Sequence, residues 1–197
     1  MIVIGILALQ GAFIEHKNIL DRLNIKNILI KKAEDIELCD GIILPGGEST
    51  SIGIIEKNIF DEIREHIKKG KAIWGICAGM ILLSNNIIGQ KIGGQKSIGG
   101  LDVVIERNFF GSQLNSFIKS LEYPKLFKKD GYFDAVFIRG PVIQKIDENV
   151  EILSKLDNDI IIAVQQNNVL GTSFHPELTN DYSWHEYFIK LFENKST

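Results

Sequence analysis

The chain has 197 residues, of which 45% are hydrophobic and 24% are charged, and its formal charge at pH 7 is −3. This balance is typical of a folded globular protein and excludes a disordered chain, while the small acidic excess disfavours nucleic acid or an anionic membrane as the main partner. The two cysteines, Cys39 and Cys77, are too few for the disulfide framework of a small secreted protein. The opening residues lack the positive region of a signal peptide, and no apolar run reaches the roughly 18 residues of a membrane helix. We therefore expect a cytoplasmic protein.

The amino-terminal half alternates apolar, β-branched segments with amphipathic ones, a pattern typical of βαβ units. Strands are expected at residues 2–7, 27–30, 40–44 and 71–76, and helices at residues 13–23, 52–67 and 80–83. Gly70 follows two lysines and ends the second of these helices. Because crossover helices pack on the faces of a parallel sheet, this half predicts a mostly parallel sheet between two helical layers.

The carboxyl-terminal half is richer in strands. Strands are expected at residues 101–106, 132–139, 150–156, 160–165 and 169–174, a final helix at 181–193, and a loop or hairpin over the glycine-rich segment 87–100. Short polar turns separate the last three strands, which is the spacing of an antiparallel meander. The predicted fold is a three-layer α/β open sheet, mostly parallel in the N-terminal half with an antiparallel C-terminal part. We expect residues 1–197 to form one domain.

Cys77 lies between a predicted strand and a predicted helix, with Gly75 and Gly79 two residues away on either side. This is the pattern of a nucleophile elbow, in which a sharp turn forces the central residue into a strained backbone conformation and presents its side chain at the edge of the sheet. The alternative is a buried structural cysteine between two small residues. Glycines at both offsets favour the elbow.

A thiol nucleophile needs a base, and the base needs a group that orients it. His175, Pro176 and Glu177 follow the last predicted strand. Pro176 favours an extended backbone at His175, and in an extended chain residues i and i+2 project to the same side. Glu177 is therefore expected to accept a hydrogen bond from Nδ1 of His175 and leave Nε2 facing the thiol. The remaining histidines are interpreted as surface or helix-packing residues: His16, His66 and His185.

The segment 45–50 reads Pro-Gly-Gly-Glu-Ser-Thr and follows a predicted strand. Two glycines allow the backbone to approach a ligand and to direct N–H groups toward it. Gly47 and Ala78 are the candidate donors of an oxyanion hole. The segment also suits a tight turn into the helix near residue 52, with Ser49 or Thr50 as the N-cap, and both interpretations can hold together. It lacks the spacing of a phosphate-binding loop.

These motifs resemble those of the class I, triad-type glutamine amidotransferases, in which an elbow cysteine, a later histidine and a glutamate follow in that order. Within that group the chain is similar to the glutaminase subunits of pyridoxal 5′-phosphate synthase. The motifs that carry this resemblance lie at residues 9–11, 45–50, 106–111, 137–141 and 175–178. Two departures are visible: Gly140 stands where relatives commonly have alanine, and Ser51-Ile52-Gly53 stands where many have an arginine.

The resemblance implies hydrolysis of L-glutamine to glutamate and ammonia, with Cys77 as nucleophile, His175 as proton carrier and Glu177 as its orienting group. It implies neither a cofactor nor a metal. It also implies a hetero-oligomer with a TIM-barrel synthase subunit that receives the ammonia through a channel for vitamin B6 biosynthesis. Glutamine would be held by six residues: Gly47, Glu48, Ser49, Arg107, Ile138 and Arg139. Two alternatives remain, namely the glutaminase of another amidotransferase, such as imidazole glycerol phosphate synthase, and a non-amidotransferase cysteine protein of the same fold.

Overall fold

The computed structural model describes residues 2–9, 11–47, 57–88, 97–107, 109 and 116–193. Its helices are α1 (Phe13–Arg22), α2 (Glu34–Glu37), α4 (Lys57–Lys68), α5 (Ala78–Leu83) and α6 (Ser183–Glu193). Its strands are β1 (Val3–Leu7), β2 (Lys26–Ile30), β3 (Gly41–Leu44), β4 (Ala72–Ile76), β5 (Ser84–Ile88), β6 (Leu101–Glu106), β7 (Ser116–Glu122), β8 (Tyr132–Ile138), β9 (Val142–Ile146), β10 (Glu151–Lys155), β11 (Ile161–Gln166) and β12 (Val169–Thr172). Short 3₁₀ turns η1 (Lys125–Phe127), η2 (Asp157–Asp159) and η3 (Pro176–Leu178) complete the described elements.

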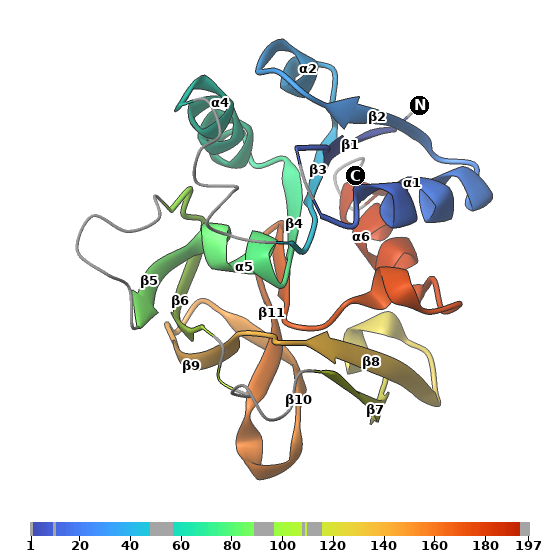
Figure 1. The fold of residues 1–197 in the computed structure, drawn as a ribbon, viewed down its shortest axis with the longest axis vertical. Helices are drawn as coiled ribbons and strands as arrows, with labels where there is room; N and C mark the ends of the chain where they lie inside the picture. The colour runs from blue at the N-terminus through green and yellow to red at the C-terminus, as the bar shows by residue number, and fades with distance from the viewer. Residues whose placement is uncertain are drawn as a thin grey trace.

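Ten strands form one large sheet in the order β2-β1-β3-β4-β12-β11-β9-β6-β5, with β10 paired to β11 (Figure 1). The strands from β2 to β12 run parallel, and β11 is antiparallel to β12, β9 and β10. The predicted division into a parallel N-terminal part and an antiparallel C-terminal part is therefore confirmed, as is the meander of the last three strands.

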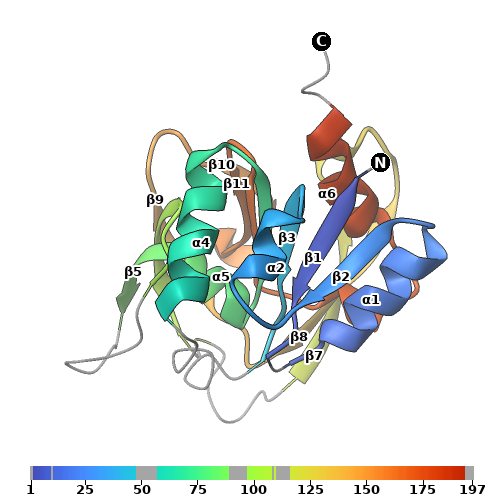
Figure 2. The same cartoon turned by 90° about the horizontal axis from the view of Figure 1, so that it is seen from above.

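The sheet separates two hydrophobic cores, so the three-layer prediction is also confirmed. Figure 2 shows α2, α4 and α5 on one face and α1 and α6 on the other. The first core includes Ile36 of α2, Ile63 of α4 and Leu82 of α5, whereas the second includes Leu20 of α1 and Trp184 of α6. The central strands are buried on both faces, which explains why their sequences read as continuous apolar runs rather than as alternating ones.

Several boundaries differ from the predicted ones. The strand expected to end at residue 139 ends at Ile138, because Arg139 adopts a left-handed backbone with φ +46° that a strand does not accommodate. The segment from residue 87 is not a simple hairpin: β5 begins at Ser84 and pairs parallel to β6, and residues 89–96 lie outside the described part of the chain. The helix expected from residue 52 is described from Lys57 onward.

The strands β7 and β9 and the short helix α2 were not predicted. Among the described residues strand β7 pairs with β8 alone, in a small antiparallel sheet, and no residue of it is fully buried. A strand with so little burial carries little of the apolar pattern on which sequence prediction depends. The partner strand β8 does contribute to the second core, through Phe133, Ala135 and Phe137. No helix in the described residues is long and apolar enough to cross a membrane.

The register of the central strands decides where the site lies. Leu44 at the end of β3 pairs with Gly75 of β4, and Thr172 at the end of β12 pairs with Ile76 of β4. Cys77 follows Ile76, so the chain segments after β3 and β12 emerge on either side of it. In an open α/β sheet this carboxyl edge is where ligands bind.

Candidate active site

Cys77 occupies a strained turn between β4 and α5. Its backbone has φ +49° and ψ −102°, in a region that side-chain-bearing residues rarely adopt. The N–H of Cys77 donates to the carbonyl of Thr172 at 2.7 Å, and its carbonyl accepts from the N–H of Ile81 at 3.2 Å. These bonds hold the turn between β12 and α5, and the predicted elbow conformation is present.

The two glycines that flank Cys77 are required by close backbone contacts. A Cβ atom at Gly75 would lie 2.6 Å from the carbonyl carbon of Gly79, and a Cβ atom at Gly79 would lie 2.0 Å from the carbonyl oxygen of Leu44. Neither neighbour is a flexible side chain, so neither position accepts a larger residue without moving the backbone. The glycine pattern thus has the steric origin that the sequence indicated.

His175 is brought beside Cys77 by the strand order. Its backbone N–H donates to the carbonyl of Val136 in β8 at 2.8 Å, which ties the segment after β12 to the small sheet. The preceding Phe174 is fully buried and packs against Phe137 of β8 and Trp184 of α6. The backbone that carries the imidazole is therefore anchored on two sides.

Glu177 lies behind His175, away from Cys77. Nδ1 of His175 is 2.7 Å from Oε1 of Glu177, and the two residues are only 6% and 5% exposed. Burial by itself would lower the pKa of His175, but hydrogen bonds with Cys77 and Glu177, and their negative charges, outweigh it and raise the pKa to about 10. The site therefore favours a protonated imidazole between Cys77 and Glu177.

A glycine-rich loop closes the other side of the imidazole. The carbonyl of Gly46 accepts a hydrogen bond from the N–H of Ala12 at 3.2 Å. Gly11 has φ +83°, and a Cβ atom there would lie 1.8 Å from the same carbonyl. The segments after β1 and β3 thus meet backbone to backbone at the edge of the site, and side chains at these glycines would separate them.

A cavity of about 670 Å³ opens above Cys77. It is lined by Gly11, Ala12, Gly46, Gly47, Cys77, Ala78, Ile81, Arg107, Ile138, Arg139, Pro141, His175 and Leu178. The structure thus brings together seven of the predicted site residues and places Glu177 directly behind them. The predicted residues Glu48 and Ser49 lie outside the described part of the chain.

Ile81 and Pro141 are lining residues that the sequence interpretation missed. Ile81 lies one turn into the helix that follows the elbow, a position from which an apolar side chain can reach the nucleophile's cavity. Pro141 ends the motif at residues 137–141, but no role in the site was predicted for it. Adjacency to a predicted motif was the signal available for both.

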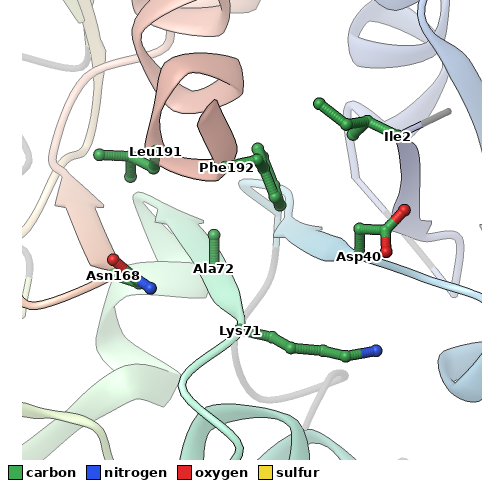
Figure 3. A pocket seen from close by; sticks show the side chains of 7 residues that line it. All are labelled: Ile2, Asp40, Lys71, Ala72, Asn168, Leu191 and Phe192. Carbon is green, nitrogen blue, oxygen red and sulfur yellow. The ribbon is translucent and has the colours of Figure 1, made fainter. Parts of the chain in front are cut away.

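A second cavity, of about 300 Å³, lies at the opposite edge of the sheet, before the first residues of β1, β3, β4 and β12 (Figure 3). Its charged side chains are already used within the fold. Lys71 donates to the carbonyl of Cys39 at 2.7 Å, and Oδ2 of Asp40 accepts from the N–H of Val3 at 2.8 Å. This cavity contains no candidate nucleophile or base.

The second cysteine has the surroundings of a packing residue. Cys39 is 1% exposed, and its thiol donates to the carbonyl of Asp35 at 3.2 Å. Burial raises the pKa of the Cys39 thiol to about 12, so it stays protonated and unreactive at neutral pH. Among the residues that the structure describes, no three histidine, cysteine or acidic side chains are grouped so that they could hold a metal ion.

Known proteins match this chain in sequence and in fold. The model of the SNO glutamine amidotransferase family matches residues 6–194. The chain is 47% identical to a pyridoxal 5′-phosphate synthase subunit PdxT of Dehalococcoides mccartyi, over 95% of this chain and 96% of that one, and 44% identical to a PdxT of Streptococcus pneumoniae, over 98% of each. A solved structure described as a glutamine amidotransferase superposes with a TM-score of 0.87 at 44% identity, covering 96% of this chain and 98% of the other. The chain therefore belongs to the SNO glutamine amidotransferase family.

Proposed function

We propose that this glutamine amidotransferase hydrolyses L-glutamine at Cys77 and passes the ammonia to a pyridoxal 5′-phosphate synthase subunit. The observation that supports the hydrolysis is the hydrogen-bonded series Cys77, His175 and Glu177 at the base of the cavity. The support for the partner is that the relatives from Dehalococcoides and Streptococcus are named as subunits of that synthase.

The first half of the reaction forms a thioester. The thiolate of Cys77 attacks the side-chain amide carbon of glutamine, forming a C–S bond and a tetrahedral oxyanion. Protonated His175 then gives its Nε2 proton to the amide nitrogen, the C–N bond breaks and ammonia leaves. Because the neighbouring groups keep His175 protonated, the acid that this step needs is already in place.

The second half hydrolyses the thioester. Neutral His175 takes a proton from water as the water oxygen attacks the thioester carbon. The C–S bond breaks, glutamate leaves with its new carboxyl group, and the thiolate is restored beside protonated His175. Glu177 holds Nδ1 of the imidazole throughout, so that Nε2 faces the sulfur in both halves.

The oxyanion is stabilised by backbone N–H groups of Gly47 and Ala78, which line the cavity on either side of the thiol. Loss of one such donor typically costs about 2.7–4 kcal/mol of transition-state stabilisation. The amino acid portion of glutamine is bound by Arg107, Ile138 and Arg139, since a free carboxylate requires a cation. Glu48 and Ser49 complete the set, with the Glu48 carboxylate as acceptor for the ammonium group.

Glutamate release from glutamine tests this function, measured with and without a TIM-barrel synthase subunit. We expect low activity of the chain alone, stimulation by the partner, and loss of activity in Cys77→Ala. Cys39→Ala is the matched control, because it removes the other buried thiol at a distance from the cavity, and it should keep the activity. Equal loss in both variants would refute the assignment of Cys77. Stimulation by an imidazole glycerol phosphate cyclase instead of the synthase would refute the assigned partner.

A further inference from the structure

Two buried histidines lie on the side of Glu177 that faces away from His175. His16 of α1 and His185 of α6 are each 0% exposed. Nδ1 of His16 is 2.9 Å from Nε2 of His185, and Nε2 of His16 is 3.7 Å from Oε2 of Glu177. The four side chains therefore form one continuous buried series, from His185 through His16 and Glu177 to His175.

Trp74 holds both histidines against the strand that leads to Cys77. Its ring meets His16 edge to face at 5.8 Å and His185 edge to face at 5.0 Å between centroids. Its Nε1–H donates to Oγ1 of Thr172 at 3.1 Å, which links β4 to β12. The imidazole pair is thus packed on the same two strands that carry Cys77 and His175, and its position is coupled to theirs.

The polar atoms around the two buried histidines favour one placement of the ring protons of His16 and His185. Oε2 of Glu177 and Nε2 of His16 have no hydrogen-bond partner within 3.5 Å among the described residues, and they face one another. If His16 carries its proton on Nε2, an N–H faces the carboxylate oxygen, and Nδ1 accepts from Nε2–H of His185. The opposite arrangement would set a bare nitrogen against the carboxylate. Nδ1 of His185 lacks a hydrogen-bond partner among the described residues in either arrangement, so the contact with Glu177 decides between them. Buried lone pairs and donors of that kind are costly.

The groups around Glu177 favour a neutral pair of histidines. Burial, followed by the charges of His185 and His175, holds the pKa of His16 well below its usual value, and burial lowers the pKa of His185 to about 3 despite Asp181 nearby. The titratable groups facing Glu177 are thus His175 on its own turn and His16 from α1, with His185 and Asp181 from the α6 end behind them. Only His175 is protonated at neutral pH.

We propose that His16, held by His185, is a positioning residue that directs its Nε2–H at Oε2 of Glu177, 3.7 Å away. The buried carboxylate then has a donor on each oxygen, and Oε1 stays directed at His175. This inference rests on the proposed glutaminase activity, because it describes how the orienting carboxylate of that reaction is held. The proposal gives His16 of α1 and His185 of α6 a role in the site, whereas the sequence suggested that both are surface or packing residues.

Three variants test the role through activity in the presence of the synthase subunit. His16→Leu removes the donor at similar volume, and His16→Gln retains an amide N–H. His66→Leu is the matched control, since His66 is also buried, at 3% exposure, but bonds to the carbonyl of Ala72 away from the site. For His16→Leu we expect kcat to fall about tenfold or more with KM changed less than about twofold, as for a group that acts on the transition state alone. His16→Gln should recover most of kcat, and His66→Leu should match the parent.

The pH profile separates positioning from packing. Without the second donor, Glu177 holds the imidazolium of His175 less firmly against Cys77, so the acid limb of kcat/KM in His16→Leu should move up by about one pH unit. The limb should stay in place in His66→Leu. A folded His16→Leu variant with parental kcat and acid limb would overturn the proposal, as would a His16→Gln variant as impaired as His16→Leu.

Two measurements do not depend on glutamine turnover. Imidazole ¹⁵N shifts of the unaltered full-length chain should show His16 and His185 neutral with the proton on Nε2; a proton on Nδ1 of His16 would overturn the proposal even if no variant folds. Alkylation of Cys77 by iodoacetamide should show the same acid-side shift in His16→Leu as the activity does. If the parent chain and the synthase subunit together release no glutamate, the proposed function fails. The imidazole ¹⁵N shifts and the alkylation rates still decide the role of His16 in that case.

Discussion

Gly46 and His175 are in van der Waals contact across the site: a Cβ atom at Gly46 would lie 2.3 Å from Cε1 of the imidazole and 3.0 Å from its Nδ1. The imidazole cannot turn away, because Glu177 holds Nδ1 at 2.7 Å. The loop after β3 and the histidine after β12 therefore fit together only if residue 46 has no side chain.

We expect Gly46→Ala to reduce kcat by about 100-fold or more, since displacing the imidazole removes the general acid and base, which contribute roughly 10²–10⁴-fold. Glutamate release with the synthase subunit measures this. Gly140→Ala is the comparison variant: its Cβ would also lie too close to a backbone atom, the carbonyl oxygen of Ser173 at 2.9 Å, but against no triad residue, so it should lose less activity than Gly46→Ala. A Gly46→Ala variant with parental kcat would show that the loop moves away without cost.

Replacing Glu177 by glutamine should lower kcat by about 100-fold or more, because the charge that raises the pKa of His175 is lost while the size of the side chain is kept. The pKa of His175 should fall, so the imidazolium stabilises the Cys77 thiolate less and alkylation of Cys77 near neutral pH should slow. Alkylation rates across pH in the two proteins measure that change. An unchanged pH dependence would mean that Glu177 does not act on His175.

The cavity contains two arginines, and we expect both to bind the carboxylate of glutamine. Arg107→Gln and Arg139→Gln should each raise KM by about 10- to 100-fold with a smaller change in kcat, the size expected for losing a charge-assisted hydrogen bond. Steady-state kinetics over a range of glutamine concentrations measure this. Arg22→Gln is the control, because Arg22 bonds to Tyr182 outside the cavity at 2.5 Å. Parental KM in both cavity variants would contradict the assignment.

Three buried histidines should make the fold sensitive to acid. Burial lowers the pKa of His66 to about 4 and that of His185 to about 3, and it lowers the pKa of His16 as well. The unfolded chain binds these protons near the usual value of 6.5, so the free energy of unfolding should fall as pH drops from about 6.5 to about 4. His175 adds no slope in this range, because its raised pKa gives a contribution that is complete below 6.5 and is lost only as pH rises toward about 10.

Urea unfolding at a series of pH values measures this effect, and His66→Leu isolates one histidine. Between pH 6.5 and 4 the free energy of unfolding of the His66→Leu variant should fall less steeply than that of the parent. The two slopes should differ by up to about 1.4 kcal/mol per pH unit, which corresponds to one proton. Identical slopes in the parent and the variant would show that His66 is already protonated in the folded chain.

The features that the sequence determined alone are the local ones. Gly75, Cys77 and Gly79 specify the elbow because the steric contacts of the turn lie within a few residues and with the adjacent strand. The contact of His175 with Glu177 is also local and was predicted, but the extended backbone expected to produce it was wrong, because Pro176 starts the 3₁₀ turn η3 that carries Glu177. Continuous apolar runs likewise indicated the central parallel strands, because those strands are buried on both faces.

The tertiary structure decided everything that depends on strand order. Cys77 and His175 meet because β12 inserts beside β4, and Gly46 joins them because β3 lies on the other side. No periodicity in the chain encodes that order, since each of these strands is equally apolar and would pair with several others. The burial of His16 and His185 is of the same kind: each occupies the apolar stripe of its helix, but only the packing of α1 and α6 on Trp74 brings the pair to Glu177. Local sterics are thus readable from residue types, whereas the choice among equivalent partners is made by the sum of long-range contacts.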